Sequence, residues 1–397
     1  MLEMNIGLFT DTYLPQVSGV ATSIKTLKDE LEQQGHNVTI FTTTDPNADK
    51  NEENIIRLAS IPFFSFKDRR IAISGSHSAV KKAKELNLDL IHTQTEFSLG
   101  LTGKQVANHL KIPCIHTYHT MYEDYLHYIA KGKIVKPYHV KILARYFCNQ
   151  TNGLIAPSER VLKQLRDYDV VRPIEIIPTG VVLEDFNLTT KVNIRQELGI
   201  STDTPVLLSL SRLSQEKNIT ALLLAMPELL QAKPNLQLVI VGKGPQCAEL
   251  KALATRLDIT DHVIFVGEKK RQEVPAYYAM ADLFVSASES ESQGLTYIES
   301  LACGTNIIAK QNEYTESLIG NGDFGKLFVQ DEDLASTILA ELDKPKDLAD
   351  LEKKRTQLLY DISSEAFGKH VFEFYQTVIA EYQYKAPRGL KIVKFYR

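Results

Sequence analysis

Residues 286–308 read SASESESQGLTYIESLACGTNII, a pattern typical of a loop and a helix that join two buried strands. The apolar run Leu283–Ser286 ends in small polar residues, and Asn306–Ile308 begins the next apolar run. Between them, a glycine at position 294 precedes a helical segment that begins near Leu295. Strands that are apolar throughout and alternate with helices indicate a parallel sheet covered on both faces.

The same alternation of strand and helix recurs along the chain in two series. The first series has short apolar runs at Ile6–Thr10, Val38–Phe41, Leu88–Ile91, Ile112–His116, Leu154–Ala156 and Ile174–Ile177. The second series has them at Val206–Leu210, Leu236–Val241, Val263–Val266, Leu283–Ser286 and Asn306–Ile308. The turn Pro178-Thr179-Gly180 and a polar stretch over 183–195 separate the two series.

This break predicts two domains. We predict an α/β fold of two Rossmann-like, doubly wound domains, 1–183 and 184–372, that face each other across a cleft. A single core stops growing at roughly 250–300 residues, and this chain has 397. We expect the basic, aromatic segment 373–397 to pack back on the first domain, with contact to lipid as the alternative. Ligands bind beyond the carboxyl ends of the strands in such sheets, so the loops there are the candidate functional residues.

Composition favours a globular protein in the cytoplasm. Contents of 44% apolar and 24% charged residues are ordinary for a soluble chain. The N-terminus lacks the basic region and long apolar core of a secretory signal, and no apolar run approaches the roughly 18 residues of a membrane-spanning helix. Four cysteines have no paired spacing, so we expect reduced thiols rather than a zinc site or disulfides.

The net charge of −4 is unevenly distributed. From Phe64 to Arg145 there are thirteen Lys and Arg against six Asp and Glu, which gives +7 in this stretch and −11 in the rest. A basic face of this kind suits an anionic membrane surface or a phosphate-bearing ligand. The alternative is an ordinary solvated surface.

The stretch 286–308 also carries chemistry. A helix that begins near Leu295 presents free backbone N–H groups and a positive dipole end, which together can hold a diphosphate. Gly294 allows the backbone to approach the ligand closely. Glu291 precedes the turn and Glu299 follows it, so the two carboxylates can bind hydroxyl groups on either side of the phosphates. The alternative is a helix with surface acids.

A second candidate site follows the strand Val206–Leu210, where the sequence reads SRLSQEKN. Arg212 offers a planar guanidinium and Lys217 a compact ammonium, and both cations suit a diphosphate. An exposed basic loop is the alternative.

Two loops of the first half complete the candidate sites. Residues 11–20 read DTYLPQVSGV and join the first strand to the first helix, with Gly19 beside the helix start. Residues 116–125 read HTYHTMYEDY at the end of another strand. His116 and His119 have no third ligand at metal-binding spacing, so a hydrogen-bonding role in a polar cleft is favoured over a metal site.

With these strings in place, the chain resembles the retaining glycosyltransferases of family four, which have the GT-B fold of two facing Rossmann-like domains. The resemblance runs from Met4 to about Phe372. It rests on the E-x₇-E string from Glu291 to Glu299, on the SRL…EK string and on Gly19 and His119. Ser292-Gln293 stands where a Phe often precedes the glycine in this family.

The resemblance implies roles for these residues. Arg212 and Lys217 would hold the donor diphosphate, Glu291 would bind the sugar hydroxyls, and His119 would hydrogen-bond the transferred sugar. Those four are the predicted catalytic residues. The predicted donor-binding residues are Gly19, Val20, Gly242, Gly244, Gly267, Glu268, Lys269, Gly294, Leu295, Thr296 and Glu299, with Glu299 on the ribose. The predicted acceptor-side residues are Asp11, Tyr13, Glu96 and Tyr122.

The family resemblance also implies a reaction. No metal and no other cofactor is expected, because the two cations and the helix start supply the positive charge. Front-face attack would retain the α configuration at the anomeric carbon, and the donor is a nucleotide-sugar, most often with uracil as its base.

Within the family, three strings look like those of the diacylglycerol glucosyltransferases, which make the glycolipid precursor of lipoteichoic acid anchors. They are TDTYLPQVSGV at 10–20, TEFSLG at 95–100 and TYHTMYEDY at 117–125. This implies UDP-glucose as donor, a lipid acceptor, and a peripheral location on the inner face of the cell membrane. The cations expected to meet an anionic membrane are Lys67, Arg69, Arg70, Lys81, Lys82, Lys84, Lys131, Lys133 and Lys136, with Phe63, Phe64 and Phe66 as inserting residues.

Three alternatives stay open. The first is a family four enzyme with a soluble or a different lipid acceptor. The second is a nucleotide-sugar epimerase on the same architecture, which would not need the E-x₇-E string. The third is a non-catalytic relative, which would not need both diphosphate cations.

Overall fold

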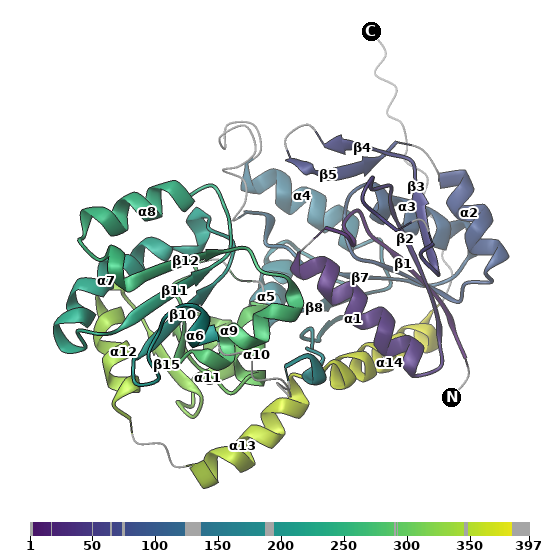
Figure 1. Cartoon of the computed structure of the whole chain (residues 1–397). Coiled ribbons are helices and arrows are strands. Elements are labelled where there is room, and N and C mark those ends of the chain that lie inside the picture. The colour runs from purple at the N-terminus through teal and green to yellow at the C-terminus, as the bar shows by residue number, and fades with distance from the viewer. Residues whose placement is uncertain are drawn as a thin grey trace. The chain divides into compact units, whose positions relative to one another are not determined.

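The computed structural model describes residues 3–16, 18–49, 51–63, 66–73, 76–123, 136–186, 194–289, 291, 293–344 and 348–382. Within this part the chain forms two compact units (Figure 1). Unit 1 comprises Met1–Pro157, Val161–Ile177 and Gly368–Arg397, and unit 2 comprises Ser158–Arg160 and Pro178–Phe367.

Unit 1 is built on a parallel sheet with the strand order β3-β2-β1-β6-β7-β8-β9. The strands are β1 (Asn5–Phe9), β2 (Asn37–Thr43), β3 (Ile55–Leu58), β6 (Leu90–Thr93), β7 (Cys114–Thr117), β8 (Gly153–Ala156) and β9 (Ile174–Ile176). A separate antiparallel hairpin consists of β4 (Ser60–Phe63) and β5 (Phe66–Ala72). The helices are α1 (Gly19–Gln33), α2 (Ser76–Glu85), α3 (Ser98–Leu110), α4 (Pro137–Cys148), α5 (Glu159–Asp167) and most of α14 (Ser364–Glu381).

Unit 2 has a parallel sheet with the order β12-β11-β10-β13-β14-β15. The strands are β10 (Val206–Leu210), β11 (Gln237–Val241), β12 (Val263–Gly267), β13 (Leu283–Ser286), β14 (Asn306–Lys310) and β15 (Gly325–Phe328). The longer helices are α7 (Ile219–Ala232), α8 (Cys247–Arg256), α9 (Val274–Met280), α10 (Leu295–Ala302), α11 (Glu313–Ile319), α12 (Leu334–Leu342) and α13 (Leu348–Asp361). Short helical turns lie at η3 (Leu183–Phe186), α6 (Ile194–Glu197), η4 (Gln215–Lys217), η5 (Thr260–His262), η6 (Arg271–Glu273) and η7 (Asp331–Asp333).

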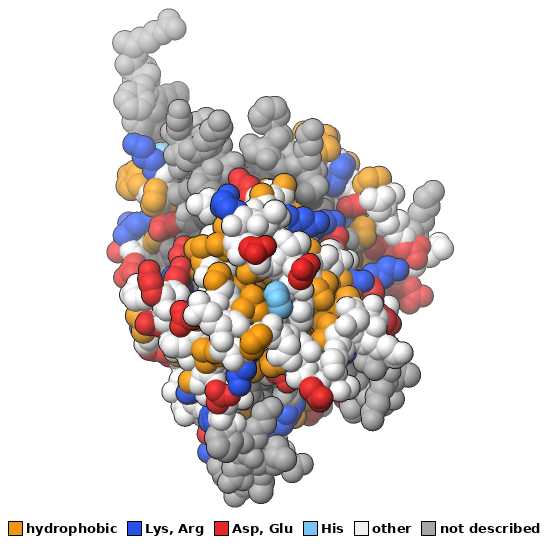
Figure 2. Space-filling view, turned by 60° about the vertical axis from the view of Figure 1, so that its left-hand side comes forward, with side chains coloured by type: hydrophobic (Ala, Val, Ile, Leu, Met, Phe, Trp, Pro, Cys, Tyr) orange, Lys and Arg blue, Asp and Glu red, His pale blue; other side chains and the backbone are white. Residues whose placement is uncertain are grey.

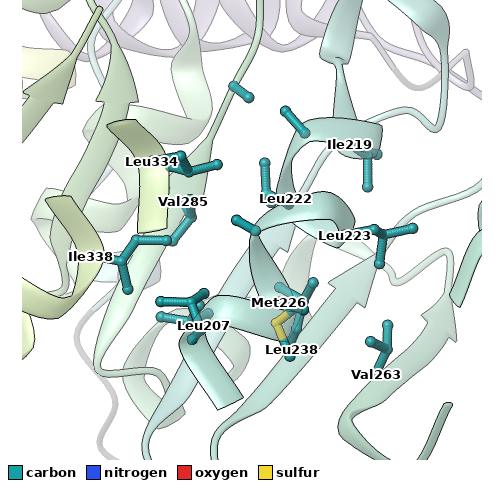
Figure 3. Close-up of a cluster of buried hydrophobic side chains, with 14 of the residues drawn as sticks. Leu207, Ile219, Leu222, Leu223, Met226, Leu238, Val263, Val285, Leu334 and Ile338 are labelled. Carbon is teal, nitrogen blue, oxygen red and sulfur yellow. The ribbon is translucent and has the colours of Figure 1, made fainter. Parts of the chain in front are cut away.

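Helix α7 illustrates how the sheet of unit 2 is covered (Figure 3). Leu222, Leu223 and Met226 recur at helical spacing, and their side chains point from α7 into one cluster with Leu207 of β10 and Leu238 of β11. All five are at most 3% exposed. Burial of one such side chain contributes roughly 1.5–3 kcal/mol, so this face anchors strand β10 and the loop that follows it.

The surface is mixed in character. Figure 2 shows one face on which hydrophobic side chains gather around a histidine in the middle of the view, with acidic and basic side chains interspersed around them. Among the coloured side chains of this face, neither charge forms a large continuous area. Exposed apolar atoms are common on soluble proteins, so this face alone indicates no ligand.

The predicted strands are present, with shifts of one or two residues at several ends. Val206–Leu210 and Leu283–Ser286 match β10 and β13, and the helix predicted from Leu295 begins there. The sequence interpretation missed β3, the β4–β5 hairpin and β15. Strand β15 reads GKLF, and a glycine and a lysine in four residues hide its apolar pattern.

Helix α14 packs on unit 1 through its C-terminal half. The ring of Phe372 stacks on His36 with centroids 4.3 Å apart. The Tyr375 hydroxyl lies 2.6 Å from His92 Nδ1 on β6, and both residues are fully buried. The domain boundary predicted between residues 183 and 184 lies inside Pro178–Phe367 of unit 2, and the predicted tail beyond residue 382 lies outside the described residues.

Candidate active site

An ion pair joins two loops of unit 2 at the carboxyl ends of neighbouring strands. Strands β10 and β13 pair in parallel, so the loops that follow them start side by side. Lys217, the last residue of η4, places its ammonium 2.5 Å from Glu291 Oε1. The two side chains are only 18% and 11% exposed. The cation and the carboxylate predicted to act on the donor are therefore direct neighbours.

Further hydrogen bonds hold the two loops together. The Glu289 amide donates to the Glu216 carbonyl at 3.0 Å, and the Ser288 hydroxyl donates to the same carbonyl at 3.3 Å. Asn218 follows η4 with a φ of 45°, and its side-chain amide donates to Asp331 at 2.9 Å. These contacts fix the position of Lys217 independently of its pairing with Glu291.

Helix α10 begins directly after this loop. Its N-cap residue is Gly294, with a φ of 74° and no side chain to accept from the first turn. A Cβ at this position would lie 2.5 Å from the ring of Tyr297, so the space there is already filled. The backbone N–H groups of Leu295 and Thr296 thus start a helix whose positive end carries no side-chain cap.

Gln293 explains the departure from the family string. Its side-chain carbonyl accepts from the Thr179 amide at 2.8 Å, and its side-chain amide donates to the Thr179 carbonyl at 2.7 Å. Both residues are buried. In addition, the Arg160 guanidinium donates to the Glu291 carbonyl at 3.0 Å. An amide that makes two backbone hydrogen bonds ties down this loop where an aromatic ring would do so by packing.

The backbone of the loop that carries Arg212 packs closely against two glycines. A Cβ on Gly242 would lie 1.9 Å from the Ser211 carbonyl, and one on Gly244 would lie 2.2 Å from the Leu213 carbonyl. Gly242 also has a φ of 139°, which disfavours any other residue. The Arg212 side chain itself is exposed. Gly242 and Gly244, two of the predicted donor-binding residues, therefore support the backbone around Arg212.

Glu299 lies on α10, half-buried. The Tyr278 hydroxyl donates to its Oε2 at 3.1 Å. Burial raises the pKa of Glu299 to about 7, while Arg271 and the Tyr278 hydrogen bond act in the opposite direction. Its protonation state therefore changes near neutral pH.

The remaining donor-side predictions lie after β12. Gly267 has a φ of 83° and no neighbour within 4 Å of an added Cβ, and its carbonyl accepts from the Gly242 amide at 2.9 Å. Glu268 forms an ion pair with Lys243, and the Lys269 ammonium lies 5.6 Å from the centroid of the Tyr277 ring. This end of β12 thus sits beside the glycine loop of β11.

In unit 1, the loop after β1 is organised by a buried carboxylate. Asp11 is 5% exposed and accepts from the Thr95 hydroxyl at 2.6 Å, the Ser98 hydroxyl and the Leu99 amide. Burial raises the pKa of Asp11. Because these contacts cap the start of α3, the structure gives Asp11 a role in joining two loops at the carboxyl edge of the sheet.

The rest of this loop leads into α1. Tyr13 is buried, which raises its pKa above the ordinary value. Ser18 caps α1 by accepting from the Ala21 amide at 3.2 Å. Gly19, the first residue of α1, is exposed, and Val20 is half-buried. The helix therefore begins at the glycine predicted to lie against the donor.

His119 is held as a neutral imidazole. Its Nε2 lies 2.7 Å from Gln94 Oε1. Burial, together with His116, lowers the pKa of His119 to about 3. In a neutral ring that donates from Nε2, Nδ1 is an acceptor, so the imidazole is set to receive a hydrogen bond from a hydroxyl group.

A polar cluster follows β6 and β7. His116 Nε2 lies 3.1 Å from Glu96 Oε1, and the Tyr122 hydroxyl donates to Glu96 Oε2. The rings of Phe97 and Tyr122 meet edge to face at 5.6 Å. Two predicted acceptor-side residues, Glu96 and Tyr122, are therefore in contact. Asp124 and Tyr125 of the same string lie outside the described residues.

The structure groups the predicted residues by unit. Lys217, Glu291 and the start of α10 lie together in unit 2, and Glu96 and Tyr122 lie together in unit 1. The sequence interpretation missed Gln293, Gln94 and Tyr278 as partners of the predicted residues. Gln293 could have been noticed because it departs from the family string. Gln94 and Tyr278 could not, because hydrogen bonds between distant segments leave no pattern in the sequence.

Two absences concern only the described residues. No group of three or more His, Cys, Asp and Glu side chains in that part of the chain is arranged to hold a metal ion. None of its helices combines the length and the apolar character needed to span a bilayer.

The two parallel α/β sheets fit a glycosyltransferase, and comparison with family models identifies this class. The chain matches the family model for glycosyl transferases group 1 over residues 190–358 and that for glycosyltransferase family 4 over residues 17–185. It belongs to this family and is an enzyme, so the predicted resemblance is confirmed.

Two curated relatives are similar along nearly the whole chain. The alpha-monoglucosyldiacylglycerol synthase of Streptococcus pneumoniae (strain ATCC BAA-255 / R6) is 51% identical over 382 residues, which is 95% of this chain and 86% of that protein. The protein of the same name from Acholeplasma laidlawii is 33% identical, over 93% of this chain and 94% of its own.

Solved structures support the GT-B fold. Sucrose-phosphate synthase from Thermosynechococcus elongatus superposes with a TM-score of 0.76 at 23% identity, over 95% of this chain and 100% of that one. Anabaena Alr3699/HepE in complex with UDP superposes with a TM-score of 0.76 at 17% identity, over 94% and 100%. The predicted α/β fold class with two Rossmann-like domains of GT-B type is confirmed.

Proposed function

We propose that this enzyme transfers glucose from UDP-glucose to diacylglycerol at the cytoplasmic surface of the membrane, with retention of the α configuration. The observation that supports it most is the contact of Lys217 with Glu291 beside the uncapped start of α10. A cation, a carboxylate and free backbone N–H groups in one loop cluster support binding of a sugar diphosphate. The 51% identity to a synthase of a monoglucosyl lipid indicates the sugar and the acceptor.

In the proposed reaction, the bond from the anomeric carbon to the β-phosphate oxygen breaks, and a bond from that carbon to the acceptor oxygen forms. The proton of the acceptor hydroxyl passes to the departing phosphate oxygen. Lys217, Arg212 and the N–H groups of Leu295 and Thr296 stabilise the charge that develops on the diphosphate. We propose that these groups replace a metal ion.

We also propose a role in this reaction for His119, which belongs to unit 1. A neutral imidazole with one nitrogen bound to Gln94 has the other available to accept from a sugar hydroxyl. We propose that His119 binds a hydroxyl group of the transferred glucose, and that the Glu96–Tyr122 pair lies on the acceptor side. Because the pKa of His119 is about 3, this imidazole stays neutral across the physiological range.

Helix α4 supports the location at a membrane surface. Its inner residues, such as Ala144 and Phe147, are buried, whereas Tyr138, Leu143 and Tyr146 on its outer side are 67%, 66% and 55% exposed. Helix α4 contains no acidic residue, and its cations are Lys141 and Arg145, preceded by Lys136. A helix with an exposed apolar face and basic residues is suited to an anionic lipid surface.

The cations predicted to face the membrane are spread over three segments. Lys81, Lys82 and Lys84 of α2 are exposed. The Arg70 guanidinium donates to the Ser60 carbonyl at 2.7 Å. The other side chains lie outside the described residues, namely Lys67, Arg69, Lys131 and Lys133, as do those of Phe63, Phe64 and Phe66. Lys136 precedes α4 and is exposed, so α2 and α4 are the proposed contacts.

The deciding experiment combines pure enzyme, UDP-[¹⁴C]glucose, and diacylglycerol in phosphatidylglycerol vesicles, followed by lipid extraction. We expect labelled monoglucosyl lipid, formed equally well in the presence of EDTA. Label in a water-soluble product alone would assign a soluble acceptor. Conversion of UDP-glucose to its epimer, or no turnover at all, would overturn the proposed reaction.

A further inference from the structure

Glu299 is held by one residue of a neighbouring helix. The Tyr278 hydroxyl, on α9, donates to Glu299 Oε2 at 3.1 Å. Among the described residues, Tyr278 is the only donor with a hydrogen bond to this carboxylate. The second carboxylate oxygen therefore retains its capacity to accept from a ligand.

The tyrosine itself has little freedom to move. Tyr278 is 0% exposed, and its ring meets Phe284 of β13 edge to face with centroids 5.5 Å apart. The backbone carbonyl of Tyr278 also accepts from the Thr305 hydroxyl at 2.7 Å. A hydroxyl fixed by its buried ring sets the direction of the carboxylate that it binds.

Few charged groups act on this carboxylate. Arg271 of η6 is the cation that favours its ionised form. Cys303, the C-cap residue of α10, follows one turn after Glu299, and burial raises the pKa of that thiol to about 12, so it stays neutral. Burial therefore opposes the charged form of Glu299, whereas Arg271 and the Tyr278 hydrogen bond favour it.

We propose that Tyr278 is a positioning residue for nucleotide binding: its hydroxyl holds one oxygen of the Glu299 carboxylate so that the other accepts from the ribose hydroxyls, and this hydrogen bond favours the charged carboxylate. This inference rests on the proposed function, in which the donor ribose binds at Glu299. Because protonation of Glu299 removes the charged acceptor, we expect the affinity for the nucleotide to fall as the pH is lowered.

The direction in which the Tyr278 hydroxyl changes the pKa of Glu299 follows from the form of the carboxyl that it stabilises. Burial raises the pKa of Glu299 to about 7, and the Tyr278 hydroxyl partly offsets this effect. Removal of the hydroxyl takes away a hydrogen bond to the charged form only, so the pKa rises further. A hydrogen bond to a charged group changes the midpoint by about one pH unit.

The test compares wild type with Tyr278→Phe, which keeps the buried ring. UDP and 2′,3′-dideoxy-UDP are titrated calorimetrically between pH 5.5 and 9, values set by the window around the pKa of about 7. We expect wild-type affinity for UDP to fall below a midpoint near pH 7, and the Tyr278→Phe midpoint to lie about one pH unit higher. Binding of the dideoxy analogue should lack this midpoint, because it has no ribose hydroxyls.

Tyr314→Phe is the matched control, since it removes another hydroxyl from the same buried cluster. It should behave as wild type. Identical pH profiles for wild type and Tyr278→Phe would overturn the inference.

The Glu299 carboxyl is also titrated by ¹³C NMR without ligand, with Glu299→Gln to assign the signal. If wild type binds no UDP at any pH, the proposed function fails. The NMR midpoint of Tyr278→Phe then still shows whether the hydroxyl controls Glu299.

Discussion

At the scale of single residues, the site depends on a few buried polar contacts between distant segments. Gln293 and Thr179 are 114 positions apart, yet exchange two hydrogen bonds. Lys217 and Glu291 are 74 apart and form an ion pair. Such pairs decide how accurately the loops are placed, because a loop has no regular backbone hydrogen bonds of its own.

Replacement of Lys217 by Ala should reduce turnover strongly. The ammonium pairs with Glu291 in the loop before α10, and loss of one preorganised charge-stabilising group typically costs about 10²–10³ in kcat. Steady-state kinetics with UDP-glucose measure this. Lys233→Ala, which removes an ion pair with Asp343 after α7, serves as the control. Near-normal turnover of Lys217→Ala would remove this residue from the site.

Gln293→Ala should loosen the loop before α10. The buried Thr179 amide and carbonyl would lose both partners, which costs roughly 1–3 kcal/mol of the free energy of unfolding. The same change should raise the KM for the donor more than it lowers kcat. Urea denaturation and steady-state kinetics give the two quantities, and an unchanged denaturation midpoint would show that Gln293 is dispensable.

At the scale of elements, helices α3 and α4 meet at a buried lysine. Lys104 of α3 is 5% exposed, and its ammonium donates to the Phe147 carbonyl at 3.1 Å and lies 4.2 Å from the centre of the Phe147 ring. Burial lowers the pKa of Lys104 to about 8. The inner side of α4 is thereby attached to α3, which leaves its apolar outer side exposed.

This lysine predicts how stability depends on pH. Between pH 8 and 10.5 the unfolded chain keeps the Lys104 proton that the folded chain has lost, so stability rises with pH. The unfolding free energy of wild type minus that of Lys104→Met should therefore increase with pH, by up to about 1.4 kcal/mol per pH unit in this window. Denaturant titrations at several pH values measure it, and a constant difference would show that Lys104 does not titrate there.

Helix α4 predicts a defect in membrane binding. Leu143→Asp places a charge in the exposed apolar face, where insertion into lipid would become unfavourable. We expect less protein to float with phosphatidylglycerol vesicles, while the thermal midpoint stays unchanged. Leu224→Asp is the control, because Leu224 of α7 is similarly exposed at 57%. Equal flotation of both variants would exclude α4 as the contact.

Elements were more predictable from sequence than contacts. The continuous apolar run of β10 and the glycine before α10 are local signals, so both elements start where expected. By contrast, strand β3 contains Arg57, whose guanidinium pairs with Glu52 and reaches the Leu14 carbonyl at 2.7 Å. That charge masks the strand pattern, and only its distant partners explain why it is tolerated.

At the scale of the whole molecule, the uneven charge distribution makes a prediction that distinguishes charge attraction to lipid from insertion of apolar side chains. If the basic stretch 64–145 attracts the membrane, binding should weaken with salt, because the Debye length falls from about 10 Å at 0.1 M to about 3 Å at 1 M. Vesicle flotation across this range measures the effect. Binding that persists at 1 M salt would indicate that insertion of apolar side chains outweighs charge attraction.

Helix α14 has a practical consequence for dissecting this enzyme. Unit 1 draws its last helix from the far end of the chain, so a fragment that stops at residue 177 leaves the surfaces around His36, His92 and Gly153 without the side chains of Phe372, Tyr375 and Phe374 that cover them. Such a fragment should aggregate when expressed alone. Co-expression with a peptide spanning 364–382 should restore its solubility, which makes unit 1 accessible as a two-piece reagent.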